Sequence, residues 1–359
     1  MLRSPRKSLF IFALWLAAFY VTWFAIVNGG HYWAEVTARW PIATGMLLGS
    51  YVAGSTPMGG GTVGFPVLVL LLDFPATIGR SFGLAIQSIG MVSATIFLLC
   101  RRQPIAWFLL RPAIFGATAG MPLGLYCISP LVGDSAVKLV FAVVWCSFGM
   151  LLIRRRHEFD CDAARTRVGG HSPRLITLYG LAAGVTGGLL AAITGVGIDM
   201  ILYAVLTLRF GIDLKVSIPT SVVAMAFTSV LGTLCLTVHP TPSNGGIPDE
   251  VFYSWLAAAP VVALGAPLGS WVVQLLPRKP TLFFVGGLCL VQFVWTLYAE
   301  KLTLAGILFA CVSVGVSIGL MYWLSYLGKS AQAISKGGAS RVAGGLPPEE
   351  SAVACDFDA

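Results

Sequence analysis

The sequence predicts an all-α polytopic membrane protein with two inverted repeats, each a broken helical hairpin plus three spans, and one extra span at each end. Three observations support this prediction: the composition, two long apolar stretches interrupted by glycine, and the distribution of basic residues. Of the 359 residues, 57% are hydrophobic and 11% are charged, whereas soluble globular proteins carry about 25% charged residues. Soluble enzymes, disordered chains and disulfide-stapled folds are therefore excluded.

The membrane spans follow from the apolar runs, because a helix needs about 20 apolar residues to cross a bilayer. Eight runs qualify: 8–27, 81–100, 106–127, 137–153, 216–238, 252–275, 281–298 and 302–327. Two further stretches, 41–72 and 174–208, exceed thirty residues and contain several glycines. A straight helix of that length would measure roughly 48 Å, against a hydrocarbon core of about 30 Å. Each stretch must therefore break, either crossing once or returning as a hairpin.

The basic residues distinguish these two paths. The net charge of +8 lies largely in short loops between apolar runs, so it reports topology rather than binding to nucleic acid. With the N-terminus inside and two returning hairpins, four basic residues are left outside: Arg39, Arg80, Lys138 and Lys301. With single crossings, four more basic residues would move outside, as would both termini: Arg209, Lys215, Arg278 and Lys279. The positive-inside rule favours two hairpins, a multi-pass protein of the inner (plasma) membrane, and both termini in the cytoplasm.

The two interrupted stretches resemble each other, which indicates an internal repeat. At an offset of 135, three glycines of the first stretch match three of the second: Gly45, Gly49 and Gly60 with Gly180, Gly184 and Gly195. The segment Gly120-Met-Pro-Leu-Gly124 recurs as Gly265-Ala-Pro-Leu-Gly269. Because the charges orient the two copies oppositely, the repeats are inverted. Inverted repeats with discontinuous helices are typical of secondary transporters, whose substrate binds near the bilayer midplane.

The chain is expected to divide at these repeats. Its parts are an N-terminal span and outer loop (1–40), a first repeat (41–153), a cytoplasmic loop (154–173), a second repeat (174–298), a last span (299–328) and a disordered cytoplasmic tail (329–359).

The first hairpin tip is rich in glycine and hydroxyls. Its candidate binding residues are Ser55, Thr56, Gly59, Gly60, Gly61 and Thr62. A helix that resumes near Gly61 exposes free N–H groups, which suit a carboxylate or sulfonate. The alternative is that these glycines only permit close helix packing.

The second tip offers Thr194, Gly195 and Gly197 as facing donors, and Asp199 follows them. An acid between apolar runs is a functional candidate, here for a coupling proton. The alternative is a neutral or helix-bound structural carboxyl group. The next span starts with Thr220 and Ser221, which either bind an anion beside the tip or simply start the helix.

Two polar residues of the first repeat each allow two interpretations. Arg80 either attracts anions at the outer mouth or is a solvated loop arginine, and the solvated loop is favoured. Gln87 faces either the cavity or another helix.

No enzyme motif is present. The four histidines are scattered and show no metal-ligand spacing, and no cofactor is expected. There is no paired-carboxylate, nucleophile-elbow or Walker sequence, so the sequence argues against an enzyme.

Several segments together resemble the sulfite exporter TauE/SafE family of anion permeases. They are Gly59-Gly60-Gly61 with Phe65-Pro66, the second copy at 187–197, Thr220-Ser221 and the paired G-x-P-L-G segments. The resemblance covers roughly 41–300. It departs from the family pattern at Ile201, which stands where the first copy has Pro66, and at Ser81-Phe82, which replaces a Thr-Ser pair.

The resemblance implies a membrane transporter of small anions, often sulfur-containing, such as sulfite or sulfoacetate. It implies no ATPase partner, and coupling to the proton gradient is expected. The alternatives are an anion channel on the same scaffold and a membrane assembly factor that transports nothing. The sequence leaves the direction of transport and the formation of a homo-oligomer open.

Overall fold

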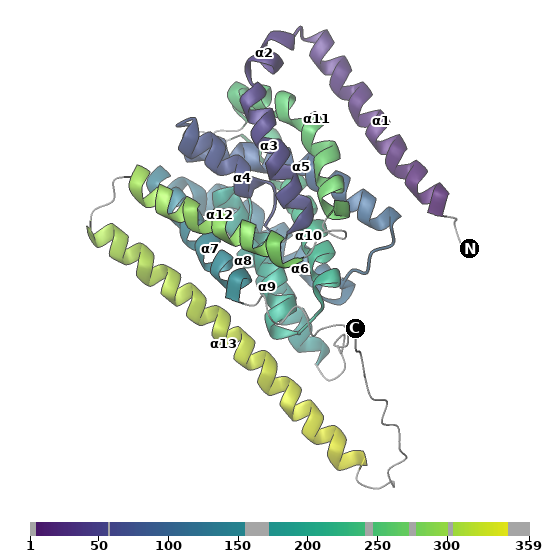
Figure 1. Ribbon diagram of the computed structural model, residues 1–359, viewed down its shortest axis with the longest axis vertical. Helices are drawn as coiled ribbons and strands as arrows, with labels where there is room; N and C mark the ends of the chain where they lie inside the picture. The colour runs from purple at the N-terminus through teal and green to yellow at the C-terminus, as the bar shows by residue number, and fades with distance from the viewer. Residues whose placement is uncertain are drawn as a thin grey trace, which may run out of the picture.

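The computed structural model describes residues 5–56, 58–154, 172–240, 247–272, 278–300 and 304–343, and these ranges are helical apart from short turns (Figure 1). The α-helices are α1 (Pro5–Gly29), α2 (Trp33–Ala38), α3 (Trp40–Ser55), α4 (Gly61–Pro66), α5 (Ala76–Cys100), α6 (Trp107–Leu123), α7 (Asp134–Arg154), α8 (Pro173–Thr194), α9 (Ile198–Ala204), α10 (Leu214–Val238), α11 (Asp249–Val272), α12 (Arg278–Ala299) and α13 (Leu304–Ala343). Short π or 3₁₀ turns extend some of them: η1 (Val67–Leu71), η2 (Gly124–Ile128), η3 (Ser129–Leu131) and η5 (Val205–Arg209).

Within these ranges, eight helices are long and apolar enough to cross a membrane: α1, α5, α6, α7, α8, α10, α11 and α13. The protein is therefore a multi-pass membrane protein. Seven of these eight correspond to predicted spans. The predicted span 281–298 falls in α12, of which Gly286–Ala299 counts as a shorter apolar helix. Conversely, α8 is long enough to cross alone, although the sequence marked it as one limb of a hairpin.

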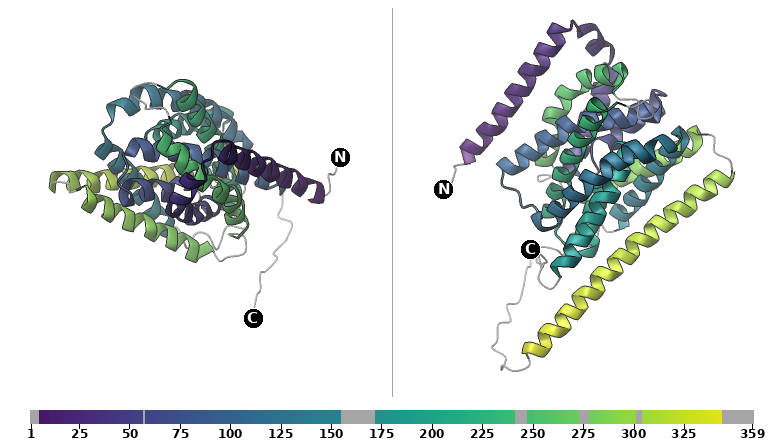
Figure 2. Two further views of the ribbon diagram at one scale, coloured as in Figure 1. Left: turned by 90° about the horizontal axis from the view of Figure 1, so that it is seen from above. Right: turned by 180° about the vertical axis from the view of Figure 1, so that it is seen from behind.

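Helices α1 and α13 lie at the edges of the bundle (Figures 1 and 2). Their apolar windows are only 6% and 11% buried, so their side chains face lipid. Helix α13 continues to Ala343, so the boundary predicted at 328 is not a helix end. Ala331 and Ala333 are strong helix formers that favour this continuation. Residues 344–359 of the predicted tail lie outside the described residues, as do residues 155–171 of the predicted cytoplasmic loop.

Both interrupted stretches double back on themselves. Helix α3 ends at Ser55 and α4 begins at Gly61. A Cβ atom at Gly45, near the start of α3, would lie 3.3 Å from the Val67 side chain beyond α4. In the second stretch, the Arg209 guanidinium lies 5.2 Å from the ring of Tyr179, near the start of α8. The returning limbs therefore run antiparallel to the incoming ones, as the hairpin path predicts.

Each hairpin packs against a helix from the other half of the chain. Helix α6 packs extensively on α8, and α11 on α3. A Cβ atom at Gly120 would overlap the backbone of Val185, and one at Gly265 would overlap the side chain of Ser50. Glycine at these positions allows the close backbone approach that holds membrane helices together. This contact gives the paired G-x-P-L-G segments a structural role.

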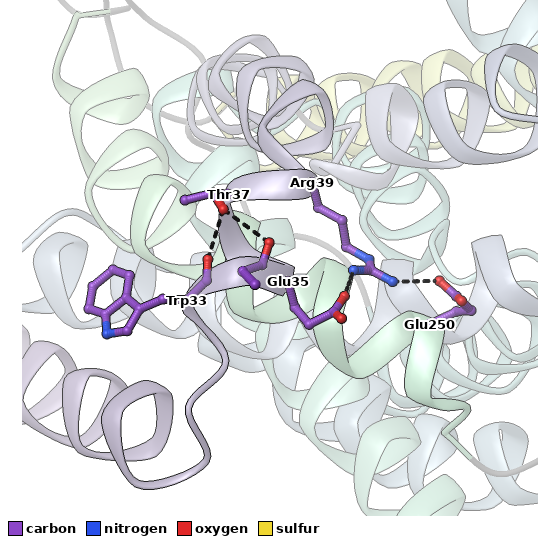
Figure 3. A network of polar contacts seen from close by, with 6 residues as sticks. Trp33, Glu35, Thr37, Arg39 and Glu250 are labelled. Carbon is purple, nitrogen blue, oxygen red and sulfur yellow. Dashed lines mark hydrogen bonds and ion pairs between the residues drawn. The ribbon is translucent and has the colours of Figure 1, made fainter.

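Two ion-pair networks also join the halves. Arg39 donates to Glu35 and, at 3.0 Å, to Glu250 at the start of α11, and it stacks 5.1 Å from the Tyr253 ring (Figure 3).

In the second network, Lys138 of α7 contacts Asp134 at 3.0 Å and Glu300, directly after α12, at 2.8 Å. Asp134 also accepts the N–H of Ala76, the first residue of α5.

Candidate functional site

The two hairpin turns have backbone conformations that require glycine. Gly59 has φ +65°, Gly195 has φ +85° and Gly197 has φ +129°. L-residues with a side chain rarely adopt these angles. Gly60, by contrast, has an ordinary helical φ of −69°. The turns are therefore built on three of the predicted glycines.

Gln87 of α5 connects its own helix to the second hairpin. Its Nε2 donates to the carbonyl oxygen of Gly83 at 3.0 Å and to that of Gly195 at 3.2 Å. Both partners are acceptors, so the amide nitrogen must occupy this position and Oε1 must point the other way. Oε1 is buried and receives no hydrogen bond from the residues that the structure describes.

Asp199 of α9 and Gln87 converge on the first hairpin at Gly59. A Cβ atom on Gly59 would lie 2.7 Å from Gln87 Oε1 and 2.8 Å from Asp199 Oδ2. Asp199 is 1% exposed. Its Oδ1 accepts the backbone N–H of Met200 at 3.0 Å, whereas Oδ2 has no hydrogen-bond partner in the described ranges. Both hairpins and α5 thus meet around two unpaired oxygens.

Several predicted hydroxyl groups use their protons locally. Thr56 donates to Val52 at 2.8 Å, Thr194 to Val196 at 2.7 Å, and Ser221 to Ile218 at 2.9 Å, each to a backbone carbonyl oxygen. Ser55 differs, because its buried Oγ has no partner among the described residues. In this conformation Ser55 is therefore the tip hydroxyl with a proton to offer an anion. The side chain of Thr62 lies outside the described part.

Thr220 links two helices. Its Oγ1 accepts the N–H of Ala106 at 2.9 Å, directly before α6, and donates to the carbonyl of Val216 at 2.6 Å. These bonds give Thr220 a packing role at the start of α6.

Arg80 is 1% exposed and lies inside α5, so the interpretation as a solvated loop arginine was wrong. Its guanidinium donates to Ser129, and its backbone lies against Gly195. Pro75 directly precedes α5, and a proline at that position was the available signal that a helix already covers residue 80.

Gln292 of α12 was missed by the sequence reasoning. It is buried, and neither its amide nitrogen nor its oxygen has a partner among the described residues. One turn earlier, Cys289 lies 3.9 Å, sulfur to sulfur, from Met58 of the first tip. Nothing in its flanking sequence distinguishes Gln292 from a lipid-facing or packed glutamine.

No group of three His, Cys, Asp or Glu side chains is positioned to hold a metal ion in the part of the chain that the structure describes.

The comparisons with known proteins agree with the membrane fold. No curated protein and no solved structure matches the chain. A family model described as Sulfite exporter TauE/SafE matches residues 41–296, which is most of the chain and includes both hairpins. Proteins of this family are membrane transporters, not enzymes, and the family implies export of anions such as sulfite. The chain therefore belongs to the sulfite exporter TauE/SafE family.

Proposed function

We propose that the protein is a secondary transporter that moves small sulfur-containing oxyanions, such as sulfite or sulfoacetate, across the cytoplasmic membrane by alternating access. One observation carries this proposal. Two glycine turns from distant parts of the chain meet, with Asp199, Gln87 and Gly59 converging on one buried point. Broken helices that meet inside a membrane protein are the usual place for a transported solute.

The contacts between the halves support an inverted repeat of 41–153 and 174–298. Helix α6 packs on the second hairpin as α11 packs on the first. The individual contacts are also equivalent. Gly120 meets Val185 and Gly265 meets Ser50, and each residue of one pair has its counterpart in the other under the sequence match. Exchanged contacts of this kind arise when two repeats are related by a two-fold axis. Rocking of one repeat against the other would then expose the site to each side in turn.

The anion would be held mainly by the backbone. The first turn of α4 offers N–H groups, from Gly60 to Thr62, that have no carbonyl partner within the helix. The first turn of α9 is already partly capped, because the Met200 N–H donates to Asp199 Oδ1. Ser55 adds a hydroxyl donor. The remaining candidate hydroxyls, of Thr56, Thr194, Thr220 and Ser221, shape the site in the present conformation and donate only after the tips rearrange.

A groove of about 210 Å³ lies between α5, α10 and α11. Ala85, Ser88, Thr233 and Trp255 are among its lining residues. On α5, Ala85 and Ser88 are turned about 200° and about 100° away from Gln87, so this groove lies on a different face of the helix from the tip contacts.

Asp199 is the proposed coupling residue. A buried carboxylate would repel an anion, whereas a protonated one would not, so proton binding and anion binding become linked. The positive-inside pattern supports cytoplasmic termini for this cycle.

The test is uptake into proteoliposomes by Gly60→Leu, with Gly287→Leu as the matched control. A Cβ at Gly60 would face Ala53 at 3.5 Å within the hairpin, whereas Gly287 of α12 has nothing within 4 Å. We expect the first variant to insert but to lose saturable uptake of sulfite or sulfoacetate, and the second to transport normally. Normal uptake by Gly60→Leu would overturn the tip site. Uptake that never saturates would indicate a channel.

A further inference from the structure

We infer that Asp199 and Gln87 together form a proton-binding site that holds the two hairpin tips closed. Its geometry stands on its own, and its consequence for transport rests on the proposed function. Asp199 is the proton carrier, and Gln87 is a positioning residue that receives the hydrogen bond.

The orientation of the Gln87 amide is fixed by its hydrogen bonds. Two backbone carbonyls, of Gly83 and Gly195, occupy both N–H groups of Nε2. Reversing the amide would bring its oxygen against these two acceptors. Oε1 is therefore fixed on the side that faces Gly59 and Asp199.

Two buried acceptors approach the same residue, Gly59. Gln87 Oε1 and Asp199 Oδ2 both approach the position that a Cβ of Gly59 would take, at 2.7 and 2.8 Å. Both atoms are buried and neither has a hydrogen-bond donor in the described ranges. An amide oxygen and a carboxylate oxygen repel each other when no proton lies between them, and a buried unpaired charge is costly. A proton on Asp199 removes the charge and allows its O–H to donate toward Oε1.

Among the described residues, the charged side chains near Asp199 make their contacts elsewhere, so they do not neutralise its carboxylate in place of a proton. Arg80 of α5 bonds to Ser129, Arg209 of η5 stacks on Tyr179, and Tyr203 of α9 packs against Phe148. Two further charged side chains on the packed elements, Arg174 of α8 and Lys215 of α10, are exposed at the beginnings of their helices.

A metal cation fits the site less well than a proton does. Hard cations such as Ca²⁺ and Mg²⁺ take six or more oxygen ligands. The described residues bring two unpaired side-chain oxygens to this point, Asp199 Oδ2 and Gln87 Oε1. Two unpaired acceptors that approach the same residue, Gly59, suit one proton carried by Asp199.

Glycine at residue 59 completes the site. Any side chain there would displace one of the two oxygens, in addition to the strain of a positive φ. Loss of the proton would set two acceptors against each other at the contact between the hairpins and so open the junction. Protonation and anion binding would then be linked, because a charged Asp199 repels an anion.

The proton site is tested without any substrate by infrared difference spectroscopy of the full-length protein between acidic and alkaline pH. We expect the carbonyl-stretch band of a buried protonated carboxylic acid, absent in Asp199→Asn and retained in Asp73→Asn, whose carboxyl group is in an exposed loop. Gln87→Met should shift this band to the frequency of a carboxylic acid that donates no hydrogen bond. A band that survives in Asp199→Asn, or one that Gln87→Met leaves unmoved, would overturn the site.

The coupling consequence is tested separately in proteoliposomes. With a proton gradient, wild type should concentrate sulfite many-fold, whereas Asp199→Asn should only equilibrate it while still exchanging labelled for unlabelled sulfite. Accumulation by Asp199→Asn, or accumulation that follows a Na⁺ gradient, would contradict proton coupling through Asp199. If neither the variants nor the wild type move any anion, the proposed function fails. The infrared result still decides the proton site.

Discussion

The three glycines in the hairpin turns differ from their neighbours in backbone angle, and this difference has a measurable consequence. Gly195→Ala should lower the thermal unfolding temperature of the detergent-solubilised protein by several degrees. The positive φ costs about 1–2 kcal/mol for a residue with a side chain, and the new Cβ would lie 2.6 Å from the Arg80 carbonyl oxygen. Gly60→Ala should leave the unfolding temperature unchanged, because φ is helical and the nearest atom is 3.5 Å away. Equal unfolding temperatures would contradict this assignment.

The sequence singles out the glycines and hydroxyl groups of the tips as candidates, but it does not show how they contact each other. The glycine clusters within apolar stretches and the lone carboxyl group of Asp199 can be recognised from the sequence alone. The contact of Gly59 with Asp199, and the bond from Gln87 to Gly195, depend on how α5 packs between two hairpins that are more than a hundred residues apart. Arg80 was misjudged for the same reason, because burial of the first turns of α5 is produced by the neighbouring elements.

Helix pairs α6–α8 and α3–α11 are held by small residues, and this contact also predicts a stability difference. Gly184→Val should destabilise the protein by on the order of 2 kcal/mol or more, as overpacking does, because its Cβ would overlap the backbone of Ala113 in α6. Gly319→Val, in lipid-facing α13 with nothing within 4 Å, is the matched control. Thermal unfolding in the same detergent measures both, and a tolerated Gly184→Val would show that α6 and α8 are not in close contact.

The link between α7 and the end of α12 predicts a pH dependence. Burial alone would raise the pKa of Glu300, but hydrogen bonds from Lys138 and Ser135 outweigh it and hold the pKa below its ordinary value. A lowered folded pKa gives stability that is present above the unfolded pKa, about 4.3, and lost as the pH falls through the folded value.

Glu300→Gln should therefore reduce the free energy of unfolding at neutral pH by on the order of 1 kcal/mol, which lowers the unfolding temperature. The difference from wild type should shrink once the pH falls below about 4. Unfolding scans across pH measure this, with exposed Asp73→Asn as the control. A difference that does not change with pH would rule out the ion pair as its cause.

At the level of elements, the sequence was most successful where apolar runs were long and bounded by charges. It placed the breaks of 41–72 and 174–208 and paired the G-x-P-L-G segments. It placed the end of the last span at 327, where the apolar span of α13 also ends, but it did not predict that the helix continues to Ala343. Composition distinguishes segments inside the membrane from segments in water. It does not fix where a helix ends when the residues beyond the span, such as alanine and lysine, also favour helix.

The whole chain has a sidedness that labelling can measure. Single cysteines at Glu35, Arg102 and Lys215, all at exposed or part-exposed positions, should react differently with a membrane-impermeant maleimide on intact cells. The positive-inside pattern predicts reaction at residue 35, and at residues 102 and 215 only after permeabilisation. Lys215→Cys is the informative variant, because the single-crossing path would expose it outside.

Transport by the wild-type protein is the measurement on which the account depends most. Purified protein in proteoliposomes would be given sulfite, sulfoacetate, taurine, acetate and sulfate, each with and without an inward proton gradient. We predict saturable uptake of at least one sulfur oxyanion that the proton gradient increases. Correctly folded protein that moves none of these anions, with or without the gradient, would contradict the account of two hairpin tips that bind and carry an anion.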